Sequence, residues 1–374
     1  MADKPRRRKV TSRTLNKKMA DGEQIVQMAI YDYRSAVIGD RLDIDILCVS
    51  DTGGMILFGH KSTVTVTFDE VMMMAKAIDR GSQYGMRMVD MPYWSFHISP
   101  EQAVENAGRF VGEANAEVMK CEGNIEHARA IEAICKAGIP VQGHVGITPM
   151  RIPQLGGFFA QGKDAEGAKR LVEDAQAFVD AGCFSILCEV TTEEVCQYLA
   201  QTLPVPVVSL GAGNKADGVH IITSDLFHLY EEHVPRHSKI YTDLIPIMED
   251  VFIRYRDEVR EHVYPGPEHT VYMDDAECEK FAKAMKWDSK LEELDKKKSG
   301  GGLSTVERLF LLIGPVAFLT YLVLRAPWIA AIPPVAFAVF VAYRRKKTPD
   351  WLRRPAEGGS IHQLDSEPAH QRVD

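Results

Sequence analysis

The stretch EVMKCEGNIEHARAIEAICKAGIPVQG, which spans residues 117–143, contains the repeating unit that decides the fold. A short apolar run at Glu117–Met119 is followed by an amphipathic pattern over Ile125–Ala137 and by a second short run at Pro140–Gly143. Apolar residues three and four apart predict a helix, whereas a short apolar run between polar residues predicts a buried strand. The stretch therefore predicts a strand, a helix and a second strand.

The same alternation extends in both directions and predicts eight strands with helices between them. The apolar runs are Ile25–Tyr31, Ile44–Ser50, Met86–Val89, Glu117–Met119, Pro140–Gly143, Phe184–Cys188, Val205–Leu210 and a last run near His220–Thr223. Eight such units over about 250 residues indicate the α/β class and a (β/α)8 TIM barrel. A doubly wound open sheet is the alternative, but no GxGxxG motif follows the first strand, which disfavours its dinucleotide-binding form.

Composition divides the chain of 374 residues into segments around this barrel. Residues 1–22 are polar and basic and predict a flexible arm, and residues 23–270 hold the catalytic barrel. Residues 271–308 are charged and predict a helix followed by a Gly-rich linker. Residues 309–343 are almost entirely apolar, and residues 344–374 form a polar tail.

Composition also excludes several classes of protein. An apolar content of 45% and a charged content of 26% are ordinary for a globular protein and exclude a wholly disordered chain. The net charge of −8 argues against a protein that coats nucleic acid. The seven cysteines lack CxxC spacing, which disfavours a zinc ribbon and a disulfide framework and fits a reducing compartment.

The apolar segment 309–343 predicts a C-terminal transmembrane helical hairpin. One helix over the whole segment would be about 52 Å long against a hydrocarbon core of about 30 Å, so two short antiparallel spans that meet near Arg325–Pro327 fit better. Arg308 and the basic run Arg344–Lys347 flank the segment, which places both flanks and the barrel in the cytoplasm. A buried helix pair or an oligomer contact is the alternative.

Acidic side chains follow several of the predicted strands. They are Asp32, Asp51, Asp90, Glu122 and Glu189. In a barrel these positions converge on one mouth, where so many anions repel each other unless a cation lies among them. Oxygen ligands suit a hard ion, Mg²⁺ first. For any one of these residues, a helix cap or a turn is the competing interpretation.

This set of residues predicts chemistry on a 2-oxoacid. A Mg²⁺ ion held by Asp51, Asp90 and Glu122 would chelate the keto and carboxylate oxygens of the 2-oxoacid and acidify its neighbouring C–H bond. Glu189, which is not used for the metal, would then remove that proton. Lys120 would offset the developing negative charge. His144, which lies between glycines, either has a ligand role or serves backbone packing.

Motifs across the chain resemble the ketopantoate hydroxymethyltransferase (3-methyl-2-oxobutanoate hydroxymethyltransferase) family, of the phosphoenolpyruvate/pyruvate-type barrel superfamily. The resemblance covers about Lys9 to about His269. It rests on Ile30–Tyr33, Ser50–Met55, Gly59–Thr63, Val89–Pro92, Asn106–Ala107, Lys120–Gly123, Gly143–Pro149, Gly156–Phe158, Gln161–Gly162, Glu189–Val190, Gly211–Asn214, Asp217–Gly218 and Val263–Gly266. These motifs occur in family order with near-family spacing.

The resemblance implies roles for individual positions. Asp51 and Asp90 match the family's metal-binding aspartates, and Glu122 matches its third metal-site carboxylate. The positions that bind the 2-oxoacid are Asp51, Thr52, Asp90 and Lys120. Glu189 matches the general base, and His144 matches a histidine in the substrate pocket.

The reaction that the resemblance implies moves a one-carbon unit from 5,10-methylenetetrahydrofolate to C3 of 2-oxoisovalerate and gives ketopantoate, on the route to pantothenate and coenzyme A. The family assembles as a homo-decamer, so the resemblance also implies a large homo-oligomer. No nucleic-acid partner is expected, because the net charge is −8.

The chain departs from the family beside the first metal aspartate. The family usually has Gly-Asp-Ser-Leu-Gly-Met where this chain has Ser50–Met55, so Thr52 adds a methyl group and Gly53 removes a leucine side chain. A reshaped pocket motivates a second hypothesis, a related barrel enzyme that makes or breaks a C–C bond in a different 2-oxoacid. A non-catalytic membrane scaffold is the third.

Overall fold

The computed structural model describes residues 7–230 and 235–298, and the chain divides into two compact units. The first unit ends at Tyr264 and holds the barrel, and the second begins at Pro265. The predicted Gly-rich linker, the hairpin at 309–343 and the tail at 344–374 lie outside the described residues.

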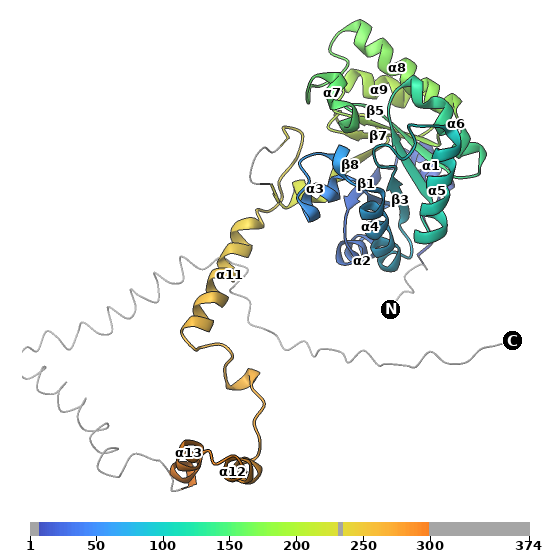
Figure 1. Cartoon of the computed structure of the whole chain (residues 1–374). Helices are drawn as coiled ribbons and strands as arrows, with labels where there is room; N and C mark the ends of the chain where they lie inside the picture. Colours follow the sequence, from blue (N-terminus) through green and yellow to red (C-terminus); the bar gives the residue numbers. More distant parts are fainter. Residues whose placement is uncertain (1–6, 231–234, 299–374) are drawn as a thin grey trace, which may run out of the picture. The chain divides into compact units, whose positions relative to one another are not determined.

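Eight parallel strands close into a barrel in chain order, with β1 paired to β8 (Figure 1). The strands are β1 (Ile25–Ile30), β2 (Ile46–Val49), β3 (Met86–Asp90), β4 (Val118–Glu122), β5 (Val141–Gly146), β6 (Ser185–Glu189), β7 (Val207–Leu210) and β8 (Gly218–Ile222). Each apolar run in the sequence overlaps one of them. The predicted (β/α)8 barrel is therefore confirmed, and the open sheet is wrong.

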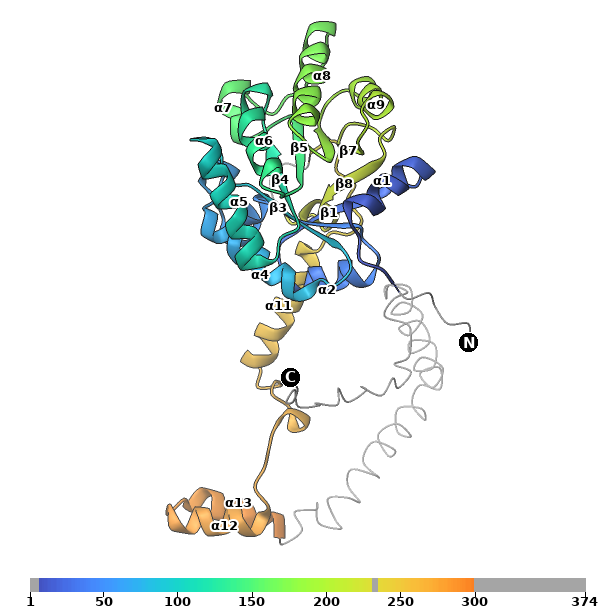
Figure 2. The same cartoon turned by 90° about the vertical axis from the view of Figure 1, so that its right-hand side faces the viewer.

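Helices surround the strands, as Figures 1 and 2 show from two sides. The longer ones are α2 (Tyr33–Arg41), α4 (Phe68–Gly81), α5 (Pro100–Ala114), α6 (Ala128–Lys136), α8 (Ala165–Asp180) and α9 (Glu193–Thr202). Short elements at the strand ends are α3 (Thr52–Phe58), η1 (Thr63–Thr65), η2 (Ile125–His127), η3 (Pro149–Arg151), α7 (Ile152–Leu155) and α10 (Thr223–Leu226).

Local sequence explains where these helices begin and how closely they approach the strands. Helix α4 begins at a capping box in which Thr67 and Glu70 satisfy each other's backbone N–H groups. Helix α8 lies against β5 at Gly143, where a Cβ atom would lie 2.6 Å from the ring of Phe178. A side chain at position 143 would therefore push α8 away from the barrel.

The N-terminal segment corrects the prediction of a flexible arm. Residues 12–21 form helix α1 (Ser12–Asp21), which buries Leu15 to 1% exposure. The Val10 N–H donates to the Tyr84 carbonyl at 2.8 Å, and Lys9 Nζ lies 2.5 Å from Glu117 Oε2. Residues 7–21 are thus attached to the barrel, while residues 1–6 lie outside the described part of the chain.

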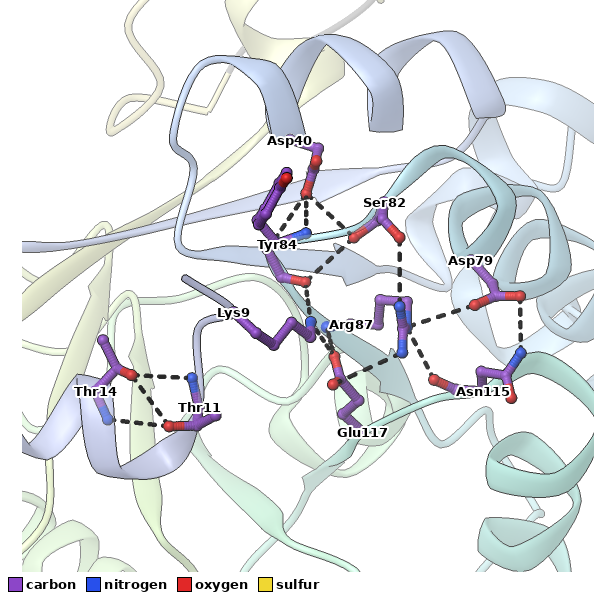
Figure 3. A network of polar contacts seen from close by, with 11 residues as sticks. Lys9, Thr11, Thr14, Asp40, Asp79, Ser82, Tyr84, Arg87, Asn115 and Glu117 are labelled. Atoms are coloured by element: carbon purple, nitrogen blue, oxygen red, sulfur yellow. Dashed lines mark hydrogen bonds and ion pairs between the residues drawn. The ribbon is translucent and has the colours of Figure 1, made fainter. Parts of the chain in front are cut away.

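A polar network anchors this segment at the N-terminal ends of β3 and β4 (Figure 3). Arg87 donates to the Asn115 carbonyl at 2.9 Å and pairs with Asp79 and Glu117, each at 3.6 Å. Asp40 accepts hydrogen bonds from the Tyr84 and Gly85 N–H groups at 2.8 and 2.7 Å. The network lies at the opposite end of the strands from the acidic residues, so we assign it to stability.

Two strands and one helix of the first unit leave apolar side chains exposed. Val26 on β1 and Val219 on β8 are 41% and 43% exposed on the outside of the barrel. Helix α11 (Ile245–Arg260) has no buried residue, and its exposed apolar side chains are Ile247, Met248, Val251, Phe252, Ile253, Tyr255 and Val259.

The second unit contains two helices where the sequence predicted one charged helix before the Gly-rich linker of residues 271–308. After the short turn η4 (Pro267–His269), two helices, α12 (Asp275–Ala284) and α13 (Asp288–Lys298), pack against each other. They bury Ala282 and Leu294, and Lys297 pairs with Asp275 at 2.8 Å. None of the helices in residues 7–230 and 235–298 is long and apolar enough to span a membrane.

Candidate active site

Strands β3 and β4 place a buried ion pair at their carboxyl ends. Asp90 is the last residue of β3 and is in register with Lys120 on β4, and Lys120 Nζ lies 2.9 Å from Asp90 Oδ2. Both residues are at least 93% buried, and the Cys48 thiol donates to Asp90 Oδ1 at 3.4 Å. Burial alone would lower the pKa of Lys120, but the attraction of Asp90, Asp51 and Glu122 outweighs it and raises the pKa.

Asp51 follows β2 and stands at the N-terminus of α3 without capping it. Its Oδ2 atom is buried and has no hydrogen-bond partner. Burial, and then the charges of Asp90 and Glu189, raise the pKa of Asp51 to about 7. A carboxylate in this position costs free energy unless a cation approaches it.

Glu122 and His144 lie side by side at the ends of β4 and β5, where their backbones are in register. The Met150 N–H donates to Glu122 Oε1 at 2.6 Å, and Glu122 Oε2 lies 3.6 Å from His144 Nδ1. Burial and the charge of Asp51 raise the pKa of Glu122, whereas burial and Lys120 lower the pKa of His144. His144 is therefore neutral at pH 7.

Glu189 ends β6 opposite Gly146 of β5. Its Oε2 atom lies 3.1 Å from His144 Nε2, although the two atoms do not form a hydrogen bond. With 15% of its side chain exposed, Glu189 is more open than Asp90 or Glu122. The next residue, Val190, has φ +47°, an uncommon conformation for a β-branched residue. Glu189 is the most exposed of the four carboxylates at this mouth.

Thr52 and Gly53 show how the chain departs from the family motif. The Thr52 hydroxyl lies 2.9 Å from both the Tyr31 hydroxyl and Ser50 Oγ. A Cβ atom at Gly53 would lie 2.5 Å from Met74 Sδ and 2.6 Å from the ring of Tyr31. Tyr31 and Met74 thus fill the space that a side chain at position 53 would need, which makes the exchange of leucine for glycine a packing change beside the site.

The donor set fits a hard divalent cation. Four carboxyl groups, those of Asp51, Asp90, Glu122 and Glu189, lie near the single cationic side chain of Lys120. The charges of neighbouring carboxylates raise the pKa values of Asp51 and Glu122. Asp51 adds a buried oxygen atom without a partner. In residues 7–230 and 235–298, no group of three or more His, Cys, Asp or Glu side chains is arranged so that it could hold a metal ion. Asp90 is bound to Lys120 instead, so a bound cation would share Asp90 with the lysine.

The structure gathers seven of the residues singled out from the sequence and separates one. Asp51, Thr52, Asp90, Lys120, Glu122, His144 and Glu189 all lie at the carboxyl ends of strands β2 to β6. Asp32 instead caps α2, because its Oδ1 accepts the N–H groups of Arg34 and Ser35 at 2.8 and 3.0 Å. The interpretation of Asp32 as a helix cap is confirmed.

Sequence reasoning missed two buried polar groups next to this site. Tyr31 and Tyr230 both contact Ser224 Oγ, at 3.5 and 2.6 Å, so a hydroxyl chain leads from Thr52 to the residues after β8. Deeper in the barrel, Gln142 hydrogen-bonds Gln27 at 2.9 Å and Ser185 at 2.9 Å. Tyr31 belongs to the family motif Ile30–Tyr33, which was the available signal, whereas no pattern singles out Gln142.

A closed parallel barrel with paired acidic and basic side chains at the carboxyl ends of its strands defines a TIM-barrel enzyme. The model of the family described as ketopantoate hydroxymethyltransferase matches residues 9–267. The chain belongs to this family.

Curated relatives agree with this assignment. The chain is 39% identical over 259 residues to the 3-methyl-2-oxobutanoate hydroxymethyltransferase of Syntrophobacter fumaroxidans, covering 69% of this chain and 92% of the relative. It is 39% identical over 269 residues to the enzyme of the same name from Chloroflexus aurantiacus strain J-10-fl, with 72% and 95% covered. The enzyme of that name from Enterococcus faecalis is 36% identical over 273 residues, with 73% and 99% covered.

Proposed function

We propose that this protein transfers a hydroxymethyl group from 5,10-methylenetetrahydrofolate to 2-oxoisovalerate and forms ketopantoate for pantothenate and coenzyme A biosynthesis. The observation that supports this most is the buried cluster at the mouth, in which Asp90 pairs with Lys120 and Glu189 approaches His144. This cluster lies within residues 9–267, the part of the chain that matches the family.

The chain's own residues have distinct parts in the proposed reaction. Glu189 removes the proton from C3 of the 2-oxoacid, and C3 forms a bond to the methylene carbon of the folate. The bonds from that carbon to N5 and N10 of the folate break, and a water molecule supplies the hydroxyl group of the product. The proton from C3 and the second proton of the water go to N5 and N10, so tetrahydrofolate leaves. Lys120 offsets the negative charge that develops on the keto oxygen. Neutral His144 lies beside Glu189, with Nε2 3.1 Å from Glu189 Oε2. Thr52, bound to Tyr31 and Ser50, lines the carboxylate end of the substrate.

The residues that would hold Mg²⁺ are Asp51, Asp90 and Glu122. A Mg²⁺ ion bound there would withdraw electron density from the keto group and acidify the C3–H bond. The buried oxygen of Asp51 that has no partner supports this assignment.

A panel of 2-oxoacids offered to the purified enzyme with Mg²⁺ and methylenetetrahydrofolate tests the proposed function. Ketopantoate formation that clearly exceeds turnover of the other acids supports it. Preference for a different 2-oxoacid would support the second hypothesis, which the departures from the family motif at Thr52 and Gly53 motivate. Inactivity on the whole panel would leave the scaffold hypothesis.

We propose a homo-oligomer in which the apolar side of α11 is covered by a second copy of the chain. Seven exposed apolar side chains on one helix form an apolar surface that favours association, and Val26 on β1 and Val219 on β8 are exposed as well. We expect Phe252→Glu to lower the mass measured by light scattering, because a buried charge opposes association. An unchanged mass would contradict the proposal, and Glu258→Gln on the same helix is the matched control.

We propose that the segment 309–343 attaches the enzyme to a membrane, with the catalytic barrel in the cytoplasm. Two uncharged runs flanked by Arg308 and Arg344–Lys347 support this proposal. We expect the full chain to float with phospholipid vesicles in a density gradient and a chain without residues 309–343 to stay below. A full chain that remains with the soluble fraction in the presence of vesicles would contradict it.

A further inference from the structure

Five aromatic rings gather in the loops that follow β3 and β4. They belong to Tyr93, Trp94, Phe96, His97 and His127. His97 is at the centre, with ring centroids 4.1 Å from Phe96, 5.2 Å from Tyr93 and 5.4 Å from His127. The Trp94 indole is stacked on His97 with an angle of 15° between the rings. We call these five residues the ring cluster.

The ring cluster adjoins the acidic mouth of the barrel. Tyr93 comes three residues after Asp90, so the cluster begins where β3 ends. The His127 ring covers Gly123, where a Cβ atom would lie 2.6 Å from its Nδ1 atom. Gly123 follows Glu122 directly, and its N–H donates to the His144 carbonyl at 3.0 Å. The cluster is thus connected to three residues of the proposed site.

The loop holds Trp94 in a fixed but unusual position. Trp94 has φ +68°, a left-handed conformation that a tryptophan rarely adopts. Its N–H donates to His97 Nδ1 at 3.2 Å and its carbonyl accepts from Gln102 at 3.0 Å, so both backbone groups are held. Phe96 is buried beneath the loop. A strained backbone conformation that is held by surrounding contacts is typical of functional loops.

Three apolar side chains of these loops are exposed at the ring cluster. Trp94 is 57% exposed, and Ile98 and Ile125, from the same two loops, are 61% and 56% exposed. Burial, and then His127, lower the pKa of His97 to about 4, and burial also lowers the pKa of His127. The cluster is therefore uncharged at neutral pH, which suits a flat apolar ring better than an anion.

The proposed reaction requires such a ring at this place. The transferred carbon of methylenetetrahydrofolate is part of a ring fused to the pteridine, and it must come within bonding distance of C3 of the bound 2-oxoacid. The pteridine must therefore lie at the rim, next to Asp90 and Glu122. The ring cluster is the aromatic surface that begins at these two residues.

We infer that the ring cluster is the site that receives the pteridine ring of the one-carbon donor, with Trp94 as its stacking surface and Ile98 and Ile125 at its edges. This inference rests on the proposed function, because it names the place of the second substrate in that reaction. It makes Trp94 a residue that binds the donor and leaves the proton transfer to Glu189.

The test separates the two substrates in the variant Trp94→Ala. We expect its KM for methylenetetrahydrofolate to rise about tenfold, the usual effect of losing one stacked ring. The rate of deuterium exchange at C3 of 2-oxoisovalerate, which needs no folate, and the KM for 2-oxoisovalerate should stay within about twofold of wild type. Trp94→Phe should recover most of the donor KM, and Tyr198→Ala, an equally exposed ring on α9, should leave it unchanged.

The possible results distinguish a failure of the inference about the ring cluster from a failure of the proposed function. A normal donor KM in Trp94→Ala, with ketopantoate still formed, overturns the inference and leaves the proposed function intact. Wild-type enzyme that neither exchanges C3 nor forms ketopantoate overturns the proposed function itself. A lower mass of Trp94→Ala in light scattering, with a normal donor KM, would show that the ring cluster contacts a second copy of the chain and would also overturn the inference.

Discussion

Glu189→Gln is expected to lose deuterium exchange at C3 of 2-oxoisovalerate by about a thousandfold, within the range for removal of a general base. Glutamine keeps the size of the side chain and its contact with His144, but it cannot accept the proton. The loss of the C3–H signal in heavy water, followed by proton NMR with Mg²⁺ present and no folate, measures the rate directly.

Binding must survive in the same variant if Glu189 acts only as the base. We expect the Kd of 2-oxoisovalerate, measured by calorimetry, to stay within about threefold of wild type, because the buried pair of Asp90 and Lys120 is untouched. The matched control is Glu194→Gln, which changes an exposed glutamate on α9 and should exchange normally. Exchange at the wild-type rate in Glu189→Gln would remove Glu189 from the role of base.

The fold could be predicted because eight apolar runs are a strong local pattern. The residues at which the strands end could not be predicted in the same way. Lys120, Glu122 and His144 were expected after their strands, but β4 continues to Glu122 and β5 to Gly146. A buried charge interrupts an apolar pattern and resembles the start of a loop. A charged side chain can be buried when an opposite charge compensates it, as Asp90 does for Lys120. That partner lies on another strand and is not visible in the local sequence pattern.

The candidate site shows the same limit. Asp32 and Asp51 both follow a strand and both precede a helix, yet Asp32 caps its helix and Asp51 does not. The choice depends on the orientation of one side chain, which leaves no trace in a single sequence. Leu15, in turn, is an isolated apolar residue in a basic segment, and its burial depends on the barrel rather than on any local period.

Asp51→Asn is expected to stabilise the metal-free protein while it abolishes ketopantoate formation. Burial raises the pKa of Asp51 to about 7, above the value near 4 of an unfolded chain. A carboxyl group with a raised pKa stabilises the fold at low pH, and this contribution is lost as the pH rises from about 4 through about 7. Asparagine removes the charge, and no cap is lost because Asp51 caps nothing.

Thermal unfolding in EDTA between pH 5 and pH 9 measures this effect. We expect Asp51→Asn to unfold several degrees above wild type at pH 8, corresponding to about 1–3 kcal/mol, with the gap narrowing toward pH 5. Added Mg²⁺ should stabilise wild type more than the variant, because Asp51 would be a ligand. In the control variant Asp32→Asn, asparagine still caps α2. Its difference in unfolding temperature from wild type should therefore not grow with pH. A variant less stable than wild type at pH 8 without metal would mean that Asp51 is already compensated in the folded chain, and the argument for a cation at this mouth would lose its main support.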